Sequence, residues 1–179
     1  MSGGDPEDAE VEAILEGRDS IVLDGELTEE APATQDPSVP VVRREALTTR
    51  IRRMPVPERL KAALRGNHEA RNVLARDPVK LVQGAVLKNP RITVEEVLNI
   101  AKSRSVQGDL LRRIAAQREW VRQYSIRQAL VLNPKTPLTV SLALLGGLRE
   151  RDVQKLARSR NIPGVIQQAA RRLLAQRGR

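Results

Sequence analysis

One phrase recurs in the sequence and constrains the fold more than any other feature. The stretch AVLKNPRITVEEV covers residues 85–97, and the similar ALVLNPKTPLTVSL covers residues 129–142, 44 residues further on. In each phrase an apolar run ends at Asn-Pro and a second apolar run follows. Proline cannot continue a helix and disfavours helical angles in the residue before it. Each phrase therefore predicts the end of one helix, a turn, and the start of the next.

The repetition extends past this phrase. LARSRN at 156–161 matches IAKSRS at 100–105 at an offset of 56 residues, so the second copy has gained twelve residues. We expect the added stretch GGLRERDVQ, at 146–154, to turn one helix of the repeat into two. RRLLAQR at 171–177 matches RRIAAQR at 112–118 and closes the second copy.

Helix signals occur at the expected places. Residues 57–76 read as an incomplete earlier copy and predict two short helices. Asp77 and Thr136 are candidate N-caps because each precedes a proline at a first helical position. Thr93 with Glu96 three residues later predicts a capping box.

Stacked copies of such a repeat can bury apolar faces that a single helix pair cannot. The sequence thus predicts an all-α fold, a short right-handed α-solenoid of stacked helical repeats over 57–177. Its helix lengths and period resemble the armadillo/HEAT class of α-helical repeats. NPRIT, EVLNIAKSR and LLRRIAAQREW also resemble an uncharacterised family of small bacterial helical-repeat proteins, which implies the fold and brings no catalytic residues.

Charge is divided unevenly along the chain. Residues 1–40 hold twelve acidic groups against Arg18 alone, whereas residues 41–179 hold thirty Lys and Arg against ten Asp and Glu. We predict a disordered acidic tail at 1–40 that has too little apolar surface to order itself, followed by a basic linker at 41–56. Because the tail is tethered, it could contact the basic domain and compete with an outside anion.

Composition excludes several functional classes. The chain has no cysteine, which excludes disulfides and thiolate metal sites, and His68 is its only histidine. No stretch approaches the ~18 apolar residues of a membrane span, and the acidic N-terminus does not resemble a secretory signal. We therefore predict a cytoplasmic protein without membrane contact. We predict no enzyme activity, no catalytic residue, no metal and no cofactor.

The remaining signal is a surplus of cations at equivalent positions of the copies. Such a surplus costs self-repulsion unless an anion neutralises it. The predicted binding surface comprises Lys102, Arg104, Arg112, Arg113, Arg118, Trp120, Arg122, Tyr124, Arg127, Arg158, Arg160, Arg171, Arg172 and Arg177.

The two aromatic residues lie inside this basic stretch. The third helix of the copy is predicted to run over 106–120, and Trp120 and Tyr124 are predicted to share one helix face. Between arginines they could stack on a base or anchor a peptide. The alternative is that both wedge between neighbouring repeats, with their polar tips on a partner group.

These features predict a non-enzymatic binding or scaffold module whose basic helical-repeat surface holds a protein partner with an acidic segment. The alternative is a nucleic-acid-binding protein that contacts the phosphate backbone with little sequence specificity. In that case the acidic tail acts as an intramolecular competitor.

Overall fold

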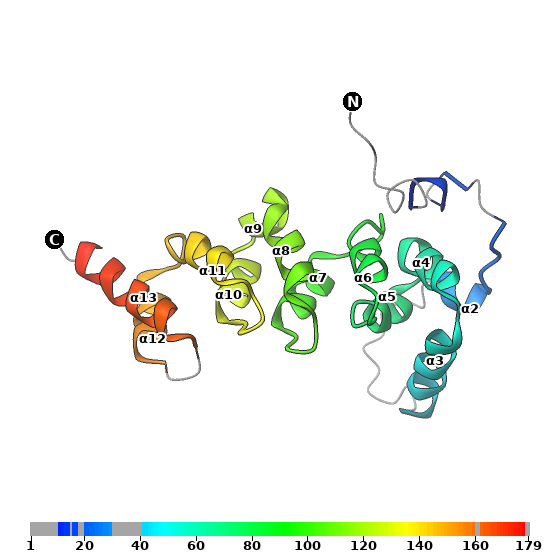
Figure 1. Ribbon diagram of the computed structural model, residues 1–179, viewed down its shortest axis with the longest axis horizontal. Helices are drawn as coiled ribbons and strands as arrows, with labels where there is room; N and C mark the ends of the chain where they lie inside the picture. Colours follow the sequence, from blue (N-terminus) through cyan, green and yellow to red (C-terminus); the bar gives the residue numbers. More distant parts are fainter. Residues whose placement is uncertain (1–10, 15, 18–19, 30–40, 160–161, 178–179) are drawn as a thin grey trace. The chain divides into compact units, whose positions relative to one another are not determined.

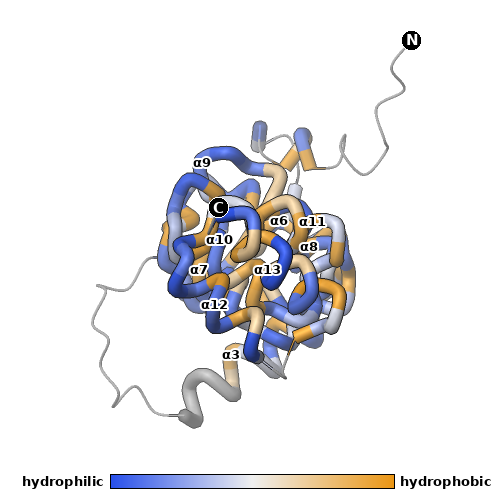
Figure 2. Tube along the Cα trace, turned by 90° about the vertical axis from the view of Figure 1, so that its left-hand side faces the viewer, coloured by the Kyte–Doolittle hydropathy of each residue, from blue (hydrophilic) through white to orange (hydrophobic). Residues whose placement is uncertain are grey.

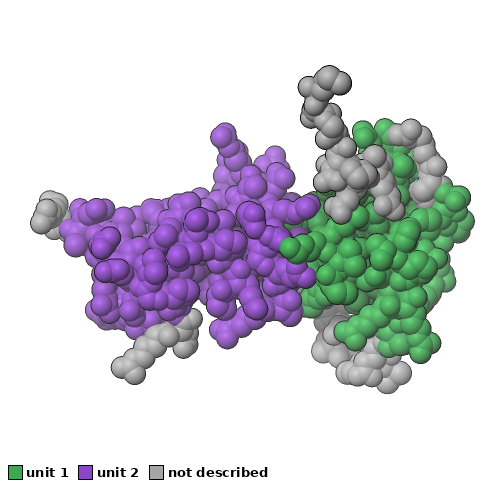
Figure 3. All heavy atoms as spheres, in the orientation of Figure 1, with its two compact units in different colours: residues 1–93 green, residues 94–179 purple. Residues whose placement is uncertain are grey.

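The computed structural model describes residues 11–14, 16–17, 20–29, 41–159 and 162–177. Within these ranges every regular element is helical and there is no strand, which confirms the all-α prediction. The chain divides into two compact units, residues 1–93 and residues 94–179 (Figures 1 and 3). Each unit is described by itself.

Unit 1 contains the helices α2 to α6, and residues 11–14 are also helical. Helix α4 lies between its neighbours and packs on α2, α5 and α6, while α3 packs on α5. Its core is aliphatic, with Leu60, Leu64 and Leu74 fully buried. The helix bounds are α2 Gly25–Thr28, α3 Val41–Arg53, α4 Val56–Arg65, α5 His68–Leu74 and α6 Lys80–Val86.

Unit 2 contains α7 to α13, and these helices pack on neighbours close in sequence. Helix α10 contacts α7, α8, α9 and α11, and α13 packs on both α12 and α11. Hydrophobic and hydrophilic stretches alternate along the trace in Figure 2, as expected for helices with one buried face. The bounds are α7 Val94–Lys102, α8 Gly108–Ala116, α9 Arg118–Arg122, α10 Tyr124–Leu132, α11 Leu138–Leu145, α12 Glu150–Arg158 and α13 Gly164–Arg177.

The repeated phrases correspond to equivalent helices. Helix α6 begins at Lys80 and α10 at Tyr124, while α7 begins at Val94 and α11 at Leu138. Both pairs keep the 44-residue offset of the sequence. The added stretch 146–154 forms the turn at 146–149 and the first half of α12, so the segment that is one helix in the first copy, α7, is two helices in the second, α11 and α12, as predicted. The two short helices predicted within residues 57–76 are α4 and α5.

Some local predictions are wrong. The helix predicted over 106–120 ends at Ala116, because Gln117 takes extended angles (φ −84°, ψ 108°). A second break at Gln123 (φ −69°, ψ 114°) separates Trp120 in α9 from Tyr124 in α10, so the two do not share a helix. Thr136 does not cap α11, since its hydroxyl is buried without a hydrogen-bond partner among the described residues.

The cap predicted at Asp77 is displaced. Helix α6 starts three residues later, at Lys80, and Val79 occupies its N-cap position. The Asp77 carboxylate instead accepts a hydrogen bond from the Val79 amide at 2.8 Å and closes the turn before the helix. Asp77 therefore belongs to the turn that precedes α6 and is not the N-cap of that helix.

Part of the predicted tail and linker is folded. Within the predicted basic linker at 41–56, residues 41–53 form helix α3, in which Ile51 is 1% exposed. Residues 20–29, assigned by sequence to a disordered tail, include helix α2, whose Leu27 is fully buried. Residues 30–40 lie outside the described residues.

Three buried asparagines hold turns to the ends of other helices. Asn89 donates to the carbonyls of Ala63 (3.0 Å) and Gly66 (3.1 Å) at the end of α4. Its own side-chain oxygen accepts from the Arg91 amide. Asn133 repeats this arrangement in unit 2, with bonds of 2.7 and 2.9 Å to the carbonyls of Ala101 and Ser103.

Asn67 makes the third such contact, to the carbonyls of Glu26 (2.8 Å) and Glu29 (3.0 Å). All three asparagines are 2–6% exposed. A buried amide of this kind stabilises because it satisfies backbone groups that would otherwise lose water without gaining a partner. We call these three residues the asparagine latches. The sequence predicts the Asn-Pro turns from proline alone, and the hydrogen bonds of the asparagine side-chain amides were not predicted.

Candidate functional site

Four of the predicted surface arginines make contacts within unit 2. Arg127 donates to the carbonyls of Val121 and Gly147, both at 2.9 Å, and Arg177 donates to those of Gly146 and Leu148. Arg171 donates to the Ala157 carbonyl at 3.2 Å, and Arg112 pairs with Asp109 one turn away. Cations near helix ends satisfy carbonyls that have no partner within their own helix.

Seven other predicted cations are exposed, and their side chains make no hydrogen bond or ion pair with any other described residue. These unpaired cations are Lys102, Arg104, Arg113, Arg118, Arg122, Arg158 and Arg172. Arg160 lies outside the described residues. The predicted surface therefore divides into four cations that contact other residues of unit 2 and seven exposed cations that make no such contact with the described residues.

Two unpaired cations border a pocket between α7 and α10, which we call the α7–α10 pocket. Lys102 and Arg104 lie at the end of α7, and the opposite wall comes from α10 and the turn after it. The pocket measures about 290 Å³ and exposes Leu132, which keeps 47% of its surface accessible. The other lining residues are Ser125, Gln128, Ala129, Asn133 and Pro134.

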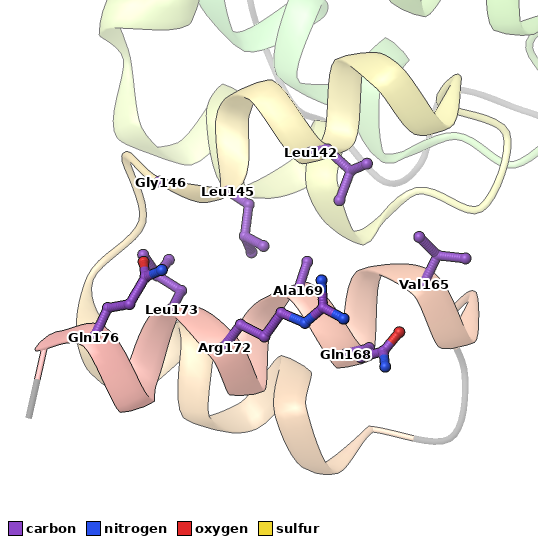
Figure 4. A pocket seen from close by; sticks show the side chains of 9 residues that line it. All are labelled: Leu142, Leu145, Gly146, Val165, Gln168, Ala169, Arg172, Leu173 and Gln176. Atoms are coloured by element: carbon purple, nitrogen blue, oxygen red, sulfur yellow. The ribbon is translucent and has the colours of Figure 1, made fainter.

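A second pocket, the α11–α13 pocket, measures about 380 Å³. Leu142 and Leu145 project from α11 toward α13, whereas Val165 and Arg172 lie on the α13 side (Figure 4). Val165 is 51% exposed. The unpaired guanidinium of Arg172 thus lies beside exposed aliphatic side chains, as the cations of the α7–α10 pocket do.

Tyr124 has a structural role. Its hydroxyl donates to the Asp152 carboxylate and accepts from the Arg149 amide at 3.1 Å, and the Arg149 guanidinium lies 4.5 Å from the ring centre. The hydrogen bond from Tyr124 lowers the pKa of Asp152, while burial and the same bond raise the pKa of Tyr124. Tyr124 therefore joins α10 to α12, as the wedge interpretation expects of its polar tip. Trp120 is half-buried.

The described residues can be set against the requirements of a metal site and of a membrane span. His68 is exposed in the first turn of α5. No group of three or more His, Asp or Glu side chains in the described ranges lies close enough to hold a metal ion. Nor is any helix within them both long and apolar enough to cross a membrane.

Charge distinguishes unit 2 from the rest of the chain. Residues 94–179 hold seventeen Lys and Arg against six Asp and Glu, a net charge of +11. The sequence analysis found this surplus but missed the aliphatic residues beside it. The sequence prediction did not single out Leu132, Leu142 or Val165, whose exposure depends on which helices pack against them.

Comparisons with protein-family models, with curated proteins and with solved structures find no match to this chain. The function must therefore be inferred from the residues themselves.

Proposed function

We propose that unit 2 is a non-enzymatic binding module that holds an acidic segment of a partner protein. The observation that carries this proposal is that in both pockets unpaired cations lie beside exposed aliphatic side chains. Carboxylates would meet Lys102 and Arg104, while an apolar side chain of the same segment would contact Leu132. A ligand of alternating acidic and apolar residues fits this surface better than a uniformly charged one.

The wider architecture belongs to the same proposal. Sequential packing of helices and the equivalent positions of α6 and α10 support a short right-handed α-solenoid of the armadillo/HEAT kind. Such repeats commonly hold extended peptides, which is an analogy at the level of fold. A cytoplasmic location completes the proposal, on the basis of the sequence alone.

The net charge of +11 supports nucleic acid as an alternative ligand. Phosphate-backbone binding depends on total charge and on salt, and needs neither a pocket nor an exposed leucine. The described surface offers one aromatic outside the Tyr124 contact, Trp120, which is too few for base stacking along a strand.

The test is a matched pair of charge variants in the full chain. Lys102→Gln with Arg104→Gln changes the α7–α10 pocket, whereas Lys135→Gln with Arg151→Gln removes the same charge from exposed positions outside it. Fluorescence polarisation would measure binding of a labelled glutamate-rich peptide containing leucines, of random duplex DNA, and of single-stranded RNA, each across a salt series.

We expect the pocket pair to weaken peptide binding about tenfold, which corresponds to about 1.4 kcal/mol, and the control pair to weaken it much less. Leu132→Ser should weaken peptide binding as well. Equal losses for both charge pairs, no effect of Leu132→Ser and tighter binding of DNA or RNA would favour the nucleic-acid alternative and overturn the peptide proposal.

A further inference from the structure

In unit 1, residues 20–29, which we call the acidic strap, are held by contacts with α3 and α4. Asp24 and Glu26 of the strap accept hydrogen bonds from Arg50 at 2.8 and 3.0 Å. Leu27 is fully buried, and α2 packs on α4. Charge and an apolar anchor therefore hold the same short segment.

Main-chain groups of the strap are held as well. Lys61 donates to the Ile21 carbonyl, and Arg91 donates to the Thr28 carbonyl at 2.9 Å. Asn67 donates hydrogen bonds to three more carbonyls of the strap. Its side-chain amide donates to those of Glu26 and Glu29, and its backbone N–H donates to that of Leu27 (2.7 Å). Contacts to backbone carbonyls do not depend on the identity of the bound side chains.

A comparison of the three asparagine latches shows what the strap replaces. Asn89 and Asn133 each hold the carbonyl end of a full helix, α4 and α7. Asn67 holds the strap in the same way, although α2 has only four residues. The strap thus occupies the place that the end of a helix occupies at the other two latches.

We propose that the face formed by Arg50, Lys61, Asn67 and Arg91 is a recognition site for acidic polypeptide segments that carry a leucine anchor. Residues 20–29 are its ligand within the same chain, and a partner segment with acids ahead of a leucine displaces them. Eleven residues join Glu29 to Val41. A tether of that kind gives an effective concentration in the millimolar range, so the strap competes strongly with an outside ligand. This site is separate from the proposed surface of unit 2.

The experiment uses the full chain and a labelled peptide with the sequence SIVLDGELTE, which copies residues 20–29. Leu27→Ala in the chain should release the strap, because a leucine in a fully buried position is a strong anchor. We expect this variant to bind the peptide at least about tenfold more tightly than the unaltered chain does. The peptide should also raise the melting temperature of the variant.

Two controls separate this site from general charge attraction. A peptide with alanine at the position of Leu27 should not bind, and adding Arg50→Gln to Leu27→Ala should remove the gain in affinity. The Lys102→Gln with Arg104→Gln pair should leave it unchanged, so failure of the unit 2 proposal would not affect this result. Circular dichroism checks whether Leu27→Ala retains its helices.

Each outcome decides the proposal. Tighter binding by folded Leu27→Ala, or recovery of helix by an unfolded variant when peptide is added, supports it. Equal peptide binding by both chains, no binding to the folded variant, or no recovery of the unfolded one would overturn it. Asp24→Asn with Glu26→Gln keeps the anchor and loosens the ion pairs alone, and it should give a smaller gain in the same direction.

Discussion

The two units neutralise their cations in different ways. Unit 1 has fourteen Lys and Arg against sixteen Asp and Glu, a net of −2, whereas unit 2 has +11. In unit 1, Arg50 pairs with Asp24 and Glu26 of the acidic strap, and Arg59 pairs with Asp77 at 2.6 Å. In unit 2, Arg112 pairs with Asp109 and Lys155 pairs with Asp152, each with an acid one turn away on the same helix. Unit 1 therefore pairs cations with acids that lie far away in the sequence, whereas unit 2 exposes seven cations that pair with no other described residue.

The largest expected effect tests whether the asparagine latches stabilise both units alike, despite the difference in charge. Asn89→Ala in unit 1 and Asn133→Ala in unit 2 should each lower the free energy of unfolding by about 2–3 kcal/mol. Asn133→Ala removes the side-chain donor to the Ala101 and Ser103 carbonyls. Asn89→Ala removes the donor to the Ala63 carbonyl, whereas Gly66 keeps a hydrogen bond from Arg71. Unsatisfied buried groups cost about 1–3 kcal/mol apiece. Urea unfolding followed by circular dichroism would measure the loss.

The matched control is Asn99→Ala, since Asn99 is exposed on α7. Its unfolding free energy should change by no more than about 0.5 kcal/mol. If Asn133→Ala behaved like this control while Asn89→Ala did not, the latches would not be equivalent in the two units.

A smaller effect concerns a contact of unit 2 alone. Tyr124→Phe should cost about 1–2 kcal/mol at pH 7, because it removes a hydrogen bond to an ionised carboxylate. Phe keeps the ring and its contact with Arg149. Thermal unfolding monitored across pH would measure the difference between the two proteins.

The same variant has a predictable pH dependence. The pKa of Asp152 is lowered in the folded protein, first by the hydrogen bond from Tyr124. A lowered pKa contributes stability above the unfolded value of about 3.9, and this contribution is lost as pH falls through the folded value. The gap between wild type and Tyr124→Phe should therefore narrow below about pH 4. A gap that stayed constant to pH 2 would contradict this assignment.

The smallest effect distinguishes two adjacent arginines of α13. Arg171→Gln should cost up to about 1 kcal/mol, since its guanidinium holds the Ala157 carbonyl, whereas Arg172→Gln should stay within about 0.5 kcal/mol. Differential scanning calorimetry of the two variants would resolve them. If both variants were equally stable, the contact of Arg171 with the Ala157 carbonyl would not stabilise the fold, and Arg171 would count among the cations available to a ligand.

Much of the fold could be predicted because proline positions and apolar spacing are local signals. The starts of α7 and α11 and the added helix α12 follow directly from the repeated phrases. The breaks at Gln117 and Gln123 could not be predicted, since neither glycine nor proline marks them. Those breaks depend on how α9 packs, which local sequence does not encode.

The candidate site was predictable in composition and not in arrangement. Cation surplus is visible in the sequence, but whether an arginine is available depends on distant carbonyls. Arg127 and Arg177 reach Gly147 and Gly146, which lie 20 and 31 residues away in the chain. The strap was misread for the same reason, because Leu27 is anchored by helices that come later in the sequence.

The asparagine latches also bear on how the protein ages. Asparagine deamidates when the next backbone nitrogen attacks its side-chain amide, and proline has no hydrogen on that nitrogen. Asn89 and Asn133 precede Pro90 and Pro134, which protects their amides from this reaction. Asn67 precedes His68 and lacks that protection. Deamidation there would turn the donor amide toward Glu26 and Glu29 into an anion facing two carbonyls, so chemical damage would loosen the acidic strap before either of the other latches.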